Sequence, residues 1–290
     1  MGACFVLSTG MLAAGAAPAV SLGVMGDSLS DEYAEESYGS YAQNWVEQLV
    51  IHAGVDAGPT AAAAGEPGGS RGEPRRTGYA LDTVLPTGVK MVLVNVPDYG
   101  NTPTVRTFFP DPVARQDVAD VIAQLNVGVD AIGQARQIPV LDLFGSGVAI
   151  FGPHASPKTT LLLGNVTIDL DQSDTAGGGN PTAGFVDDGI HPNTTIQGIF
   201  ANVVLTALSI GYGSILPVFS EAEILAHRGL AYGGADTLTA ALGNYSDYVA
   251  NYAPSPAVVP ALSPLGIAVT GLLLAGAALF ALPMRRVLQM

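Results

Sequence analysis

Apolar and polar positions in the middle of the chain follow two spacings, one typical of buried strands and one typical of helices. The continuous apolar runs Met91 to Val96 and Ile138 to Leu143 predict two central strands. Between them, apolar residues recur at spacings of 3, 1, 3, 4 and 3 residues, which places them on one face of a helix. These residues are Val118, Val121, Ile122, Leu125, Val129 and Ile132. Strands that alternate with helices predict an α/β domain with a parallel sheet.

Further elements extend this pattern on both sides. Gly164-Asn165 separates two short apolar runs and predicts a surface hairpin. The Gly-, Pro- and Ala-rich residues 54 to 80 break every periodic pattern and predict a loop. The remaining predictions are a short strand from Val20 to Val24, a helix from about Tyr41 to His52 and a last helix of the domain from Ile196 to Leu208.

The N-terminal end is apolar. Residues 5 to 19 are uncharged and rich in alanine, and they end in the small-x-small pattern Ala17-Pro18-Ala19. This composition predicts a secretory signal over residues 1 to 19. A signal normally starts with basic residues, and no Lys or Arg precedes Arg71. A buried strand is therefore the alternative interpretation of this end.

The C-terminal end contains an uncharged run from Leu265 to Leu282, followed by Arg285-Arg286. A helix of roughly 20 apolar residues crosses a bilayer, so this run predicts a transmembrane helix within an anchor segment of residues 265 to 290. Basic residues favour the cytoplasmic side, which places the rest of the chain outside. A buried core helix is the alternative, but it would carry polar residues along one face, and this run is apolar all round. The Pro-rich residues 253 to 264 predict a semi-extended stalk.

The charge composition excludes several classes of protein. The 290 residues carry 25 acidic and 11 basic side chains, a formal net charge of −14. Nucleic-acid binding requires clustered cations that release counterions, so a nucleic-acid partner is excluded. The single cysteine, Cys4, excludes an intramolecular disulfide and a zinc site built on several thiolates.

Two short motifs carry residues that are able to do chemistry. The first, Gly26 to Asp31, follows the predicted strand Val20 to Val24 and contains Ser28. Open α/β sheets place their sites at this end of a strand, and backbone N–H groups at a helix start favour developing negative charge. The alternative is a simple helix cap, which Ser and Asp make routinely.

The second motif, Asp187 to Asn193, stands immediately before the last predicted helix. Asp188 and His191 are three residues apart, so the carboxylate is able to accept the Nδ1–H of the imidazole and leave Nε2 as a base. Pro192 suits the first turn of the helix that follows. A histidine near a helix start is also often structural. The other histidines have no comparable carboxylate nearby in the sequence and are assigned no role; they are His52, His154 and His227.

Three further carboxylates, Asp169, Asp171 and Asp174, stand close together in the sequence. They lack the complete ligand pattern of a calcium loop and its closing glutamate. We therefore expect a solvated acidic loop rather than a calcium site.

The two motifs together resemble the SGNH (GDSL) family of serine esterases and lipases. Gly26-Asp27-Ser28-Leu29 is similar to the family's first signature and Asp188-x-x-His191 to its last, and the resemblance covers about residues 20 to 252. It implies a flavodoxin-like three-layer α/β/α sandwich with a parallel sheet, in which Ser28 is the nucleophile, His191 the base and Asp188 its partner. It implies no metal and no organic cofactor. Other segments that look like the family are Arg75 to Tyr79, Asn95 to Gly100 and Asp142 to Phe144.

The chain departs from the family at the oxyanion hole. It lacks the family's Gly-x-Asn-Asp block, and the run Met91 to Val96 resembles the family's fourth strand rather than its third. The domain is therefore one strand short of the family pattern. The candidates to replace the missing donors are Gly65, Gly69 and Gly100-Asn101, each of which is equally typical of a turn.

The tail also carries a resemblance. A short Pro-containing motif from Val259 to Gly266, an apolar run and a basic pair are similar to bacterial sorting signals of the exosortase type. We therefore expect an exported, envelope-anchored ester hydrolase that acts on small esters or acylated glycans through an acyl-enzyme, with the membrane and a sorting enzyme as partners. The alternative is a catalytically impaired SGNH-like surface protein that binds a glycan or a partner.

Overall fold

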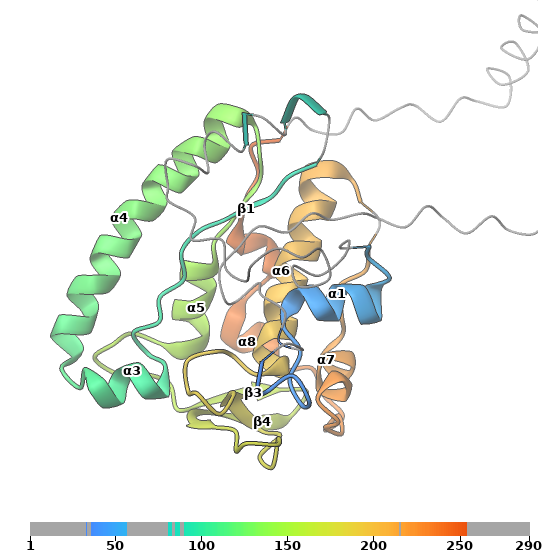
Figure 1. The fold of residues 1–290 in the computed structure, drawn as a ribbon. Coiled ribbons are helices and arrows are strands. Elements are labelled where there is room, and N and C mark those ends of the chain that lie inside the picture. Colours follow the sequence, from blue (N-terminus) through green and yellow to red (C-terminus); the bar gives the residue numbers. More distant parts are fainter. Residues whose placement is uncertain are drawn as a thin grey trace, which may run out of the picture. The chain divides into compact units, whose positions relative to one another are not determined.

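The computed structural model describes residues 33, 36–56, 81–82, 85–87, 90–214 and 216–253. The chain divides into a unit of residues 1–254 and a unit of residues 255–290. The predicted signal, the strand Val20 to Val24, the motif with Ser28, most of the predicted loop and the predicted transmembrane helix lie outside the described residues. The described part is an α/β fold with two small mixed sheets (Figure 1).

The first sheet contains β1 (Leu93–Val94), β2 (Val140–Leu141) and β6 (Val249–Ala250) in the order β1-β2-β6. β1 and β2 are parallel, and β6 is antiparallel to β2. The helices α3 (Pro103–Phe108) and α4 (Pro112–Arg136) form the crossover between the parallel strands. The two predicted central strands are confirmed, but both are shorter than their apolar runs.

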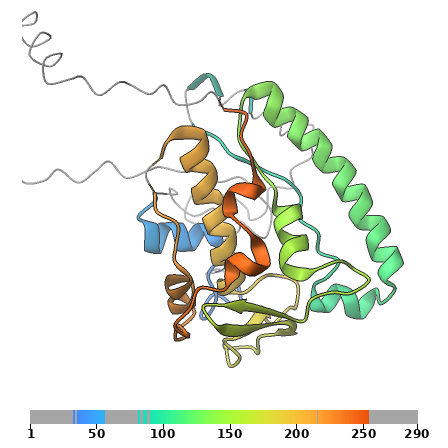
Figure 2. The same ribbon diagram turned by 180° about the vertical axis from the view of Figure 1, so that it is seen from behind.

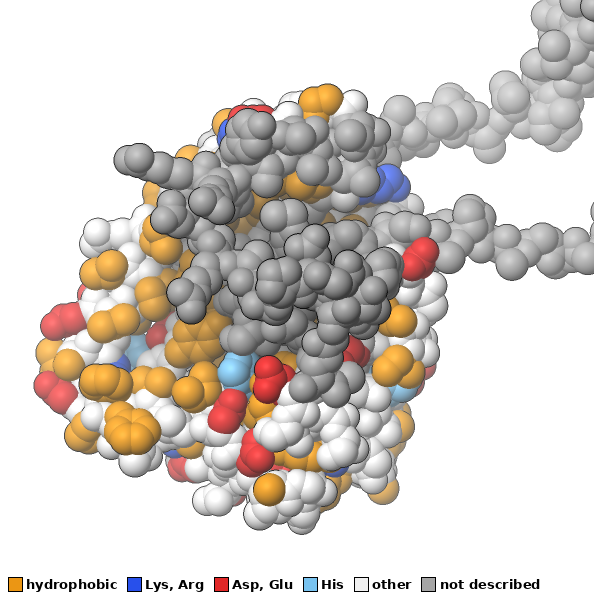
Figure 3. All heavy atoms as spheres, viewed as in Figure 1, with side chains coloured by type: hydrophobic (Ala, Val, Ile, Leu, Met, Phe, Trp, Pro, Cys, Tyr) orange, Lys and Arg blue, Asp and Glu red, His pale blue; other side chains and the backbone are white. Residues whose placement is uncertain are grey.

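Helix α4 confirms the predicted helix, but only part of its predicted apolar face is turned inward, since Ile122, Val129 and Ile132 are partly buried. Val118, Val121 and Leu125 are 60%, 65% and 49% exposed, and Figure 3 shows apolar side chains along the outer side of α4 and α3. The buried residues include Gly133 and Asn126. A Cβ at Gly133 would lie 2.2 Å from Cγ2 of Val140, so this side of the helix approaches β2 too closely for larger residues.

The second sheet contains β3 (Thr160–Leu163), β4 (Val166–Ser173) and β5 (Ala183–Phe185) in that order. β3 and β4 form the predicted hairpin. Gly164 and Asn165 both have positive φ, 57° and 61°, which a type I′ turn requires. The hairpin is not purely a surface feature, because alternate side chains enter the core; these are Leu161, Leu163, Ile168 and Leu170.

Helix α6 (Thr194–Tyr212) is the central helix and confirms the last predicted helix. In the described part of the chain, it has the length and composition of a membrane span, but 83% of its apolar window is buried inside the fold. Helices α1 (Trp45–Ala53) and α7 (Glu221–His227) pack against it. α1 confirms the helix predicted from Tyr41 to His52, with a later start at its capping residue Asn44.

The remaining elements are short. Helix α5 (Leu143–Phe151) starts directly after β2 and lies between α4 and α6 in both views (Figures 1 and 2). Two shorter helices, α7 and α8 (Leu238–Leu242), follow α6. Single turns of 3₁₀ helix stand at η2 (Leu85–Thr87) and η3 (Tyr245–Tyr248).

Candidate functional site

The turn before α6 brings Asp188 and His191 together. Asp188 Oδ2 accepts a hydrogen bond from His191 Nδ1 over 2.5 Å. Asp188 Oδ1 accepts from the backbone N–H groups of Ile190 and His191, at 2.7 and 2.9 Å. The contact expected from the Asp-x-x-His spacing is therefore present, and it leaves Nε2 on the side of the imidazole that faces away from the carboxylate.

These contacts set the charge of Asp188. Burial acts to raise the pKa of this carboxyl, but hydrogen bonds from the His191 side chain and from two backbone N–H groups outweigh it, and the pKa lies below its usual value. The carboxylate is thus charged at neutral pH and holds the proton on Nδ1. The His191 side chain is 17% exposed, so it lies near the surface.

Helix α3 is hydrogen-bonded to the same turn. Thr104 Oγ1 donates to the backbone oxygen of Asp188 over 2.6 Å, and Thr104 N donates to the backbone oxygen of Gly189 over 3.1 Å. Gly189 has φ 68°, and a Cβ there would lie 2.5 Å from Thr104 Oγ1. The glycine is therefore required both by its conformation and by the close approach of α3. Sequence reasoning missed Thr104, which no local pattern connects to Asp188.

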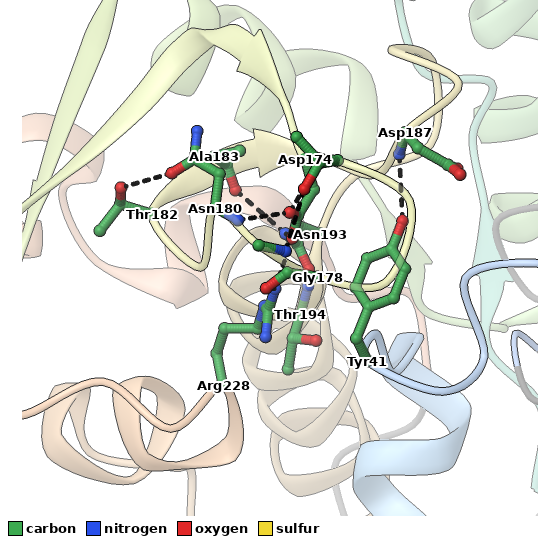
Figure 4. A network of polar contacts seen from close by, with 12 residues as sticks. Tyr41, Asp174, Gly178, Asn180, Thr182, Ala183, Asp187, Asn193, Thr194 and Arg228 are labelled. Atoms are coloured by element: carbon green, nitrogen blue, oxygen red, sulfur yellow. Dashed lines mark hydrogen bonds and ion pairs between the residues drawn. The ribbon is translucent and has the colours of Figure 1, made fainter.

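A buried polar network holds the start of α6 (Figure 4). Asn193 caps the helix, since its Oδ1 accepts from Thr194 N over 2.8 Å. Its Nδ2 donates to Asp174 Oδ2 and to the backbone oxygen of Ala183, both at 3.2 Å. Asp174 is in turn paired with Arg228. Asn193, two positions after His191, is therefore hydrogen-bonded both to the second sheet and to α6.

The same network reaches the other end of the turn. The Arg228 guanidinium lies 5.4 Å from the centre of the Tyr41 ring, and the Tyr41 hydroxyl accepts from the backbone N–H of Asp187 over 3.3 Å. Both ends of the segment from Asp187 to Asn193 are therefore anchored to the same cluster.

This network corrects two predictions. The carboxylates expected in a solvated acidic loop are paired instead, Asp174 with Arg228 in the interior and Asp171 with Arg106. Sequence proximity suggested a loop, but Asp171 lies in β4 and Asp174 directly follows it, and both contact arginines that are distant in the sequence. Pro192 does not occupy the first turn of α6, because Asn193 is the cap, and Pro192 instead forms a β-bridge with Phe185.

Two tyrosine rings lie beside the imidazole. The centre of the Tyr33 ring is 6.1 Å from that of His191 at an interplanar angle of 83°, and Tyr38 lies at 5.9 Å and 31°. Both tyrosines are buried. Tyr33 stands five residues after Ser28 in the sequence. Ser28 itself lies outside the described residues, so of the three predicted site residues the described structure places Asp188 and His191.

The Gly100-Asn101 pair, one candidate for the oxyanion hole, is engaged elsewhere. The N–H of Gly100 donates to Asp98 Oδ1 over 2.8 Å. Asn101 Nδ2 donates to the backbone oxygen of Gly152 over 2.6 Å, and its Oδ1 lies 3.0 Å from His154 Nδ1. Gly65 and Gly69 lie outside the described residues. The described geometry therefore favours the turn interpretation for Gly100-Asn101.

The other histidines require a correction. His154, expected to have no carboxylate partner, is buried with its Nε2 2.8 Å from Asp98 Oδ2. The two residues are distant in sequence, which is why spacing gave no signal. His52 and His227 stack on each other with ring centres 3.5 Å apart. Burial, followed by the charge of His52, lowers the pKa of His227 to about 4.

The ends of the two parallel strands carry polar residues with structural contacts. Asn95 follows β1 and Asp142 follows β2, and Asn95 Nδ2 donates to Asp142 Oδ1 over 2.7 Å. Both side chains also accept from backbone N–H groups at the start of α5. These residues therefore join the sheet edge to α5.

Cavities of about 380 Å³ between α6 and α8 and about 370 Å³ beside α3 include neither Asp188 nor His191 in their walls. The described residues contain no group of three or more His, Cys, Asp or Glu able to hold a metal ion.

Comparison of the chain with family models, with curated proteins and with solved structures gave no match.

Proposed function

We propose that this protein is a serine ester hydrolase of the GDSL type, with Ser28 as nucleophile, His191 as general base and Asp188 as the residue that orients the base. One observation carries the proposal: Asp188 accepts the Nδ1–H of His191 while two backbone N–H groups hold its other oxygen. A carboxylate held in this way fixes the tautomer in which Nε2 is free to accept a proton.

The reaction follows from these roles. The Ser28 hydroxyl attacks the ester carbonyl carbon as its proton moves to His191 Nε2, and the imidazolium then gives that proton to the departing alcohol. Water, activated by the same imidazole, hydrolyses the acyl-enzyme and releases the acid and the free serine. The charged Asp188 stabilises the imidazolium in both steps. We propose small esters or acylated glycans as substrates.

The position of Tyr33 supports the participation of Ser28. Five residues span at most about 18 Å, and Tyr33 is in ring contact with His191. The length of chain between Ser28 and Tyr33 therefore allows Ser28 to reach His191. We further propose that Val20 to Val24 is a strand of a flavodoxin-like α/β/α sandwich, with Ser28 at its carboxyl end.

The ends of the chain suggest where the enzyme acts. We propose that residues 1 to 19 direct export and that residues 265 to 290 anchor the domain in the cell envelope or address it to a sorting enzyme. The domain of residues 20 to 252 would then act outside the cytoplasmic membrane.

A fluorophosphonate probe tests the proposal, because it phosphonylates only an activated serine. We expect the full-length wild type to be labelled and Ser28→Ala to remain unlabelled. Ser30→Ala is the matched control, since it removes a hydroxyl from the same motif and should retain labelling. His191→Gln should label at least 100-fold more slowly. If well-folded wild type is not labelled, the hydrolase proposal is wrong.

A non-catalytic SGNH-like surface protein that binds a glycan or a partner is the second candidate. The engaged hydrogen bonds of Gly100 and Asn101 favour it, because one pair of candidate oxyanion donors is occupied elsewhere. Losing one such donor costs about 100- to 1,000-fold in turnover. Hydrolysis of p-nitrophenyl acetate above the rate of Ser28→Ala would eliminate this candidate.

A further inference from the structure

Tyr33 occupies an unusual position between the two candidate motifs. Its side chain is 0% exposed although it belongs to the polar segment after Ser28. The ring stands edge-on to His191 and also edge-on to Tyr38, whose ring centre is 4.8 Å away. A buried ring packed in this way restricts the rotation of the imidazole beside it.

The hydroxyl of Tyr33 makes hydrogen bonds to residues that follow His191 in the chain. It donates to the backbone oxygen of Pro192 over 3.1 Å and accepts from Gln197 Nε2 over 2.7 Å. Pro192 directly follows His191, and Gln197 belongs to the start of α6. The hydroxyl therefore uses both its donor and its acceptor capacity to join the histidine turn to the helix. Burial raises the pKa of this phenol well above its usual value, so the proton remains available for Pro192.

His191 is thus held by two sets of contacts, one to its imidazole and one to the backbone that follows it. Asp188 fixes the imidazole through Nδ1, and Tyr33 fixes the peptide that follows the histidine while its ring covers the imidazole edge-on. Tyr33 stands five residues after Ser28 in the sequence, so it connects the histidine turn to the part of the chain that carries the proposed nucleophile.

We propose that Tyr33 is a positioning residue that holds the His191 imidazole in place through its ring and its hydroxyl. Its consequence for catalysis rests on the proposed function, since it acts by keeping Nε2 of His191 aligned with Ser28. Tyr33 itself takes no part in proton transfer.

The test is Tyr33→Phe in the full-length chain, which keeps the ring and removes the hydroxyl. We expect kcat for p-nitrophenyl acetate to fall about 10- to 100-fold with KM nearly unchanged, because a small misplacement of a base is felt in the chemical step. Tyr245→Phe is the matched control. Its hydroxyl accepts from Asn202 Nδ2 over 2.9 Å, far in sequence from the turn, so its loss should affect stability without changing kcat. Gln197→Met is a second variant that removes the other partner of the hydroxyl, should Tyr33→Phe fold poorly.

A spectroscopic readout separates this proposal from the proposed function. The Nδ1 proton of His191 should give a downfield resonance, assigned by its loss in His191→Gln. We expect Tyr33→Phe to shift it or speed its exchange with water, and Tyr245→Phe to leave it unchanged. This result would support the positioning role even if wild type hydrolyses no ester and binds no probe. An unchanged resonance in folded Tyr33→Phe, or unchanged kcat in an active enzyme, would overturn it.

Discussion

Asp174 and Arg228 form an ion pair that is almost completely removed from water, with side-chain exposures of 0% and 9%. The Asp174 carboxylate also accepts from Thr175 N, Asn180 N and Asn193 Nδ2. The pair therefore supports the cap of α6, two residues after His191. A charge of this kind is stabilising only while its partner is present.

Arg228→Met should accordingly destabilise the fold strongly. Removing the guanidinium leaves a buried carboxylate without its counter-ion, which costs about 3–5 kcal/mol. Urea unfolding at pH 7 measures the change in the free energy of unfolding. Arg136→Met serves as the control, because Arg136 pairs with the largely exposed Asp82 and should change the stability very little. Equal effects of the two substitutions would contradict the structural role of the buried pair.

Asp188→Asn should abolish most of the proposed activity without unfolding the protein. The neutral amide no longer stabilises the imidazolium, and its NH2 group is able to donate to Nδ1, which favours the tautomer with the proton on Nε2. We therefore expect kcat to fall about 1,000- to 10,000-fold. Steady-state ester hydrolysis measures this change. Asp187→Asn is the control, because the structure uses the backbone N–H of Asp187 to bind Tyr41. A comparable loss in Asp187→Asn would argue against a specific role for Asp188.

The sequence predicted well where the signal is local. The hairpin follows from Gly164-Asn165, because only a few residue types accept positive φ at two successive positions. The contact between Asp188 and His191 follows from their spacing of three residues. The long periodic helix that became α4 follows from the repeat of its apolar positions. Each of these depends on neighbours in the chain rather than on the tertiary fold.

The rest depended on contacts between distant residues. The buried side of α4 includes Asn126 and Gly133, which a pattern of apolar residues ignores. The partners of Asp174 and of His154 come from other parts of the chain. Helix α7 was missed although Ser220 and Glu223 form a capping box, a signal that the sequence does carry.

Asn126→Ala tests the account of α4. Asn126 Oδ1 accepts from Val96 N and its Nδ2 donates to Val96 O, both at 2.9 Å, so one side chain satisfies the backbone at the end of β1. Its loss leaves two backbone groups unpaired, at about 1–3 kcal/mol each. Urea unfolding should show this decrease in stability. Gln124→Ala, an exposed position on the same helix, should leave the stability nearly unchanged; equal stability of the two variants would show that the contact to Val96 contributes nothing.

The stacked pair of His52 and His227 predicts how stability depends on pH. Burial, and then the neighbouring His52, lower the pKa of His227 to about 4 in the folded chain, whereas an unfolded histidine titrates near 6.5. Between these values the unfolded chain binds more protons than the folded chain, so the stability contribution of neutral His227 is complete above about pH 6.5 and is lost as the pH falls toward 4.

His227→Gln should weaken this dependence, because glutamine does not titrate. We expect the free energy of unfolding of wild type to fall between pH 7 and pH 4.5. In His227→Gln the slope of this free energy against pH should be smaller, by at most the amount that corresponds to the binding of about one proton. Urea unfolding at three or four pH values measures both slopes. His52→Gln provides a second comparison. Removal of the like charge should raise the pKa of His227 and so narrow the pH range over which its titration lowers the stability. Identical pH slopes in wild type and His227→Gln would mean that the stacked imidazole is not the group whose titration limits stability in acid.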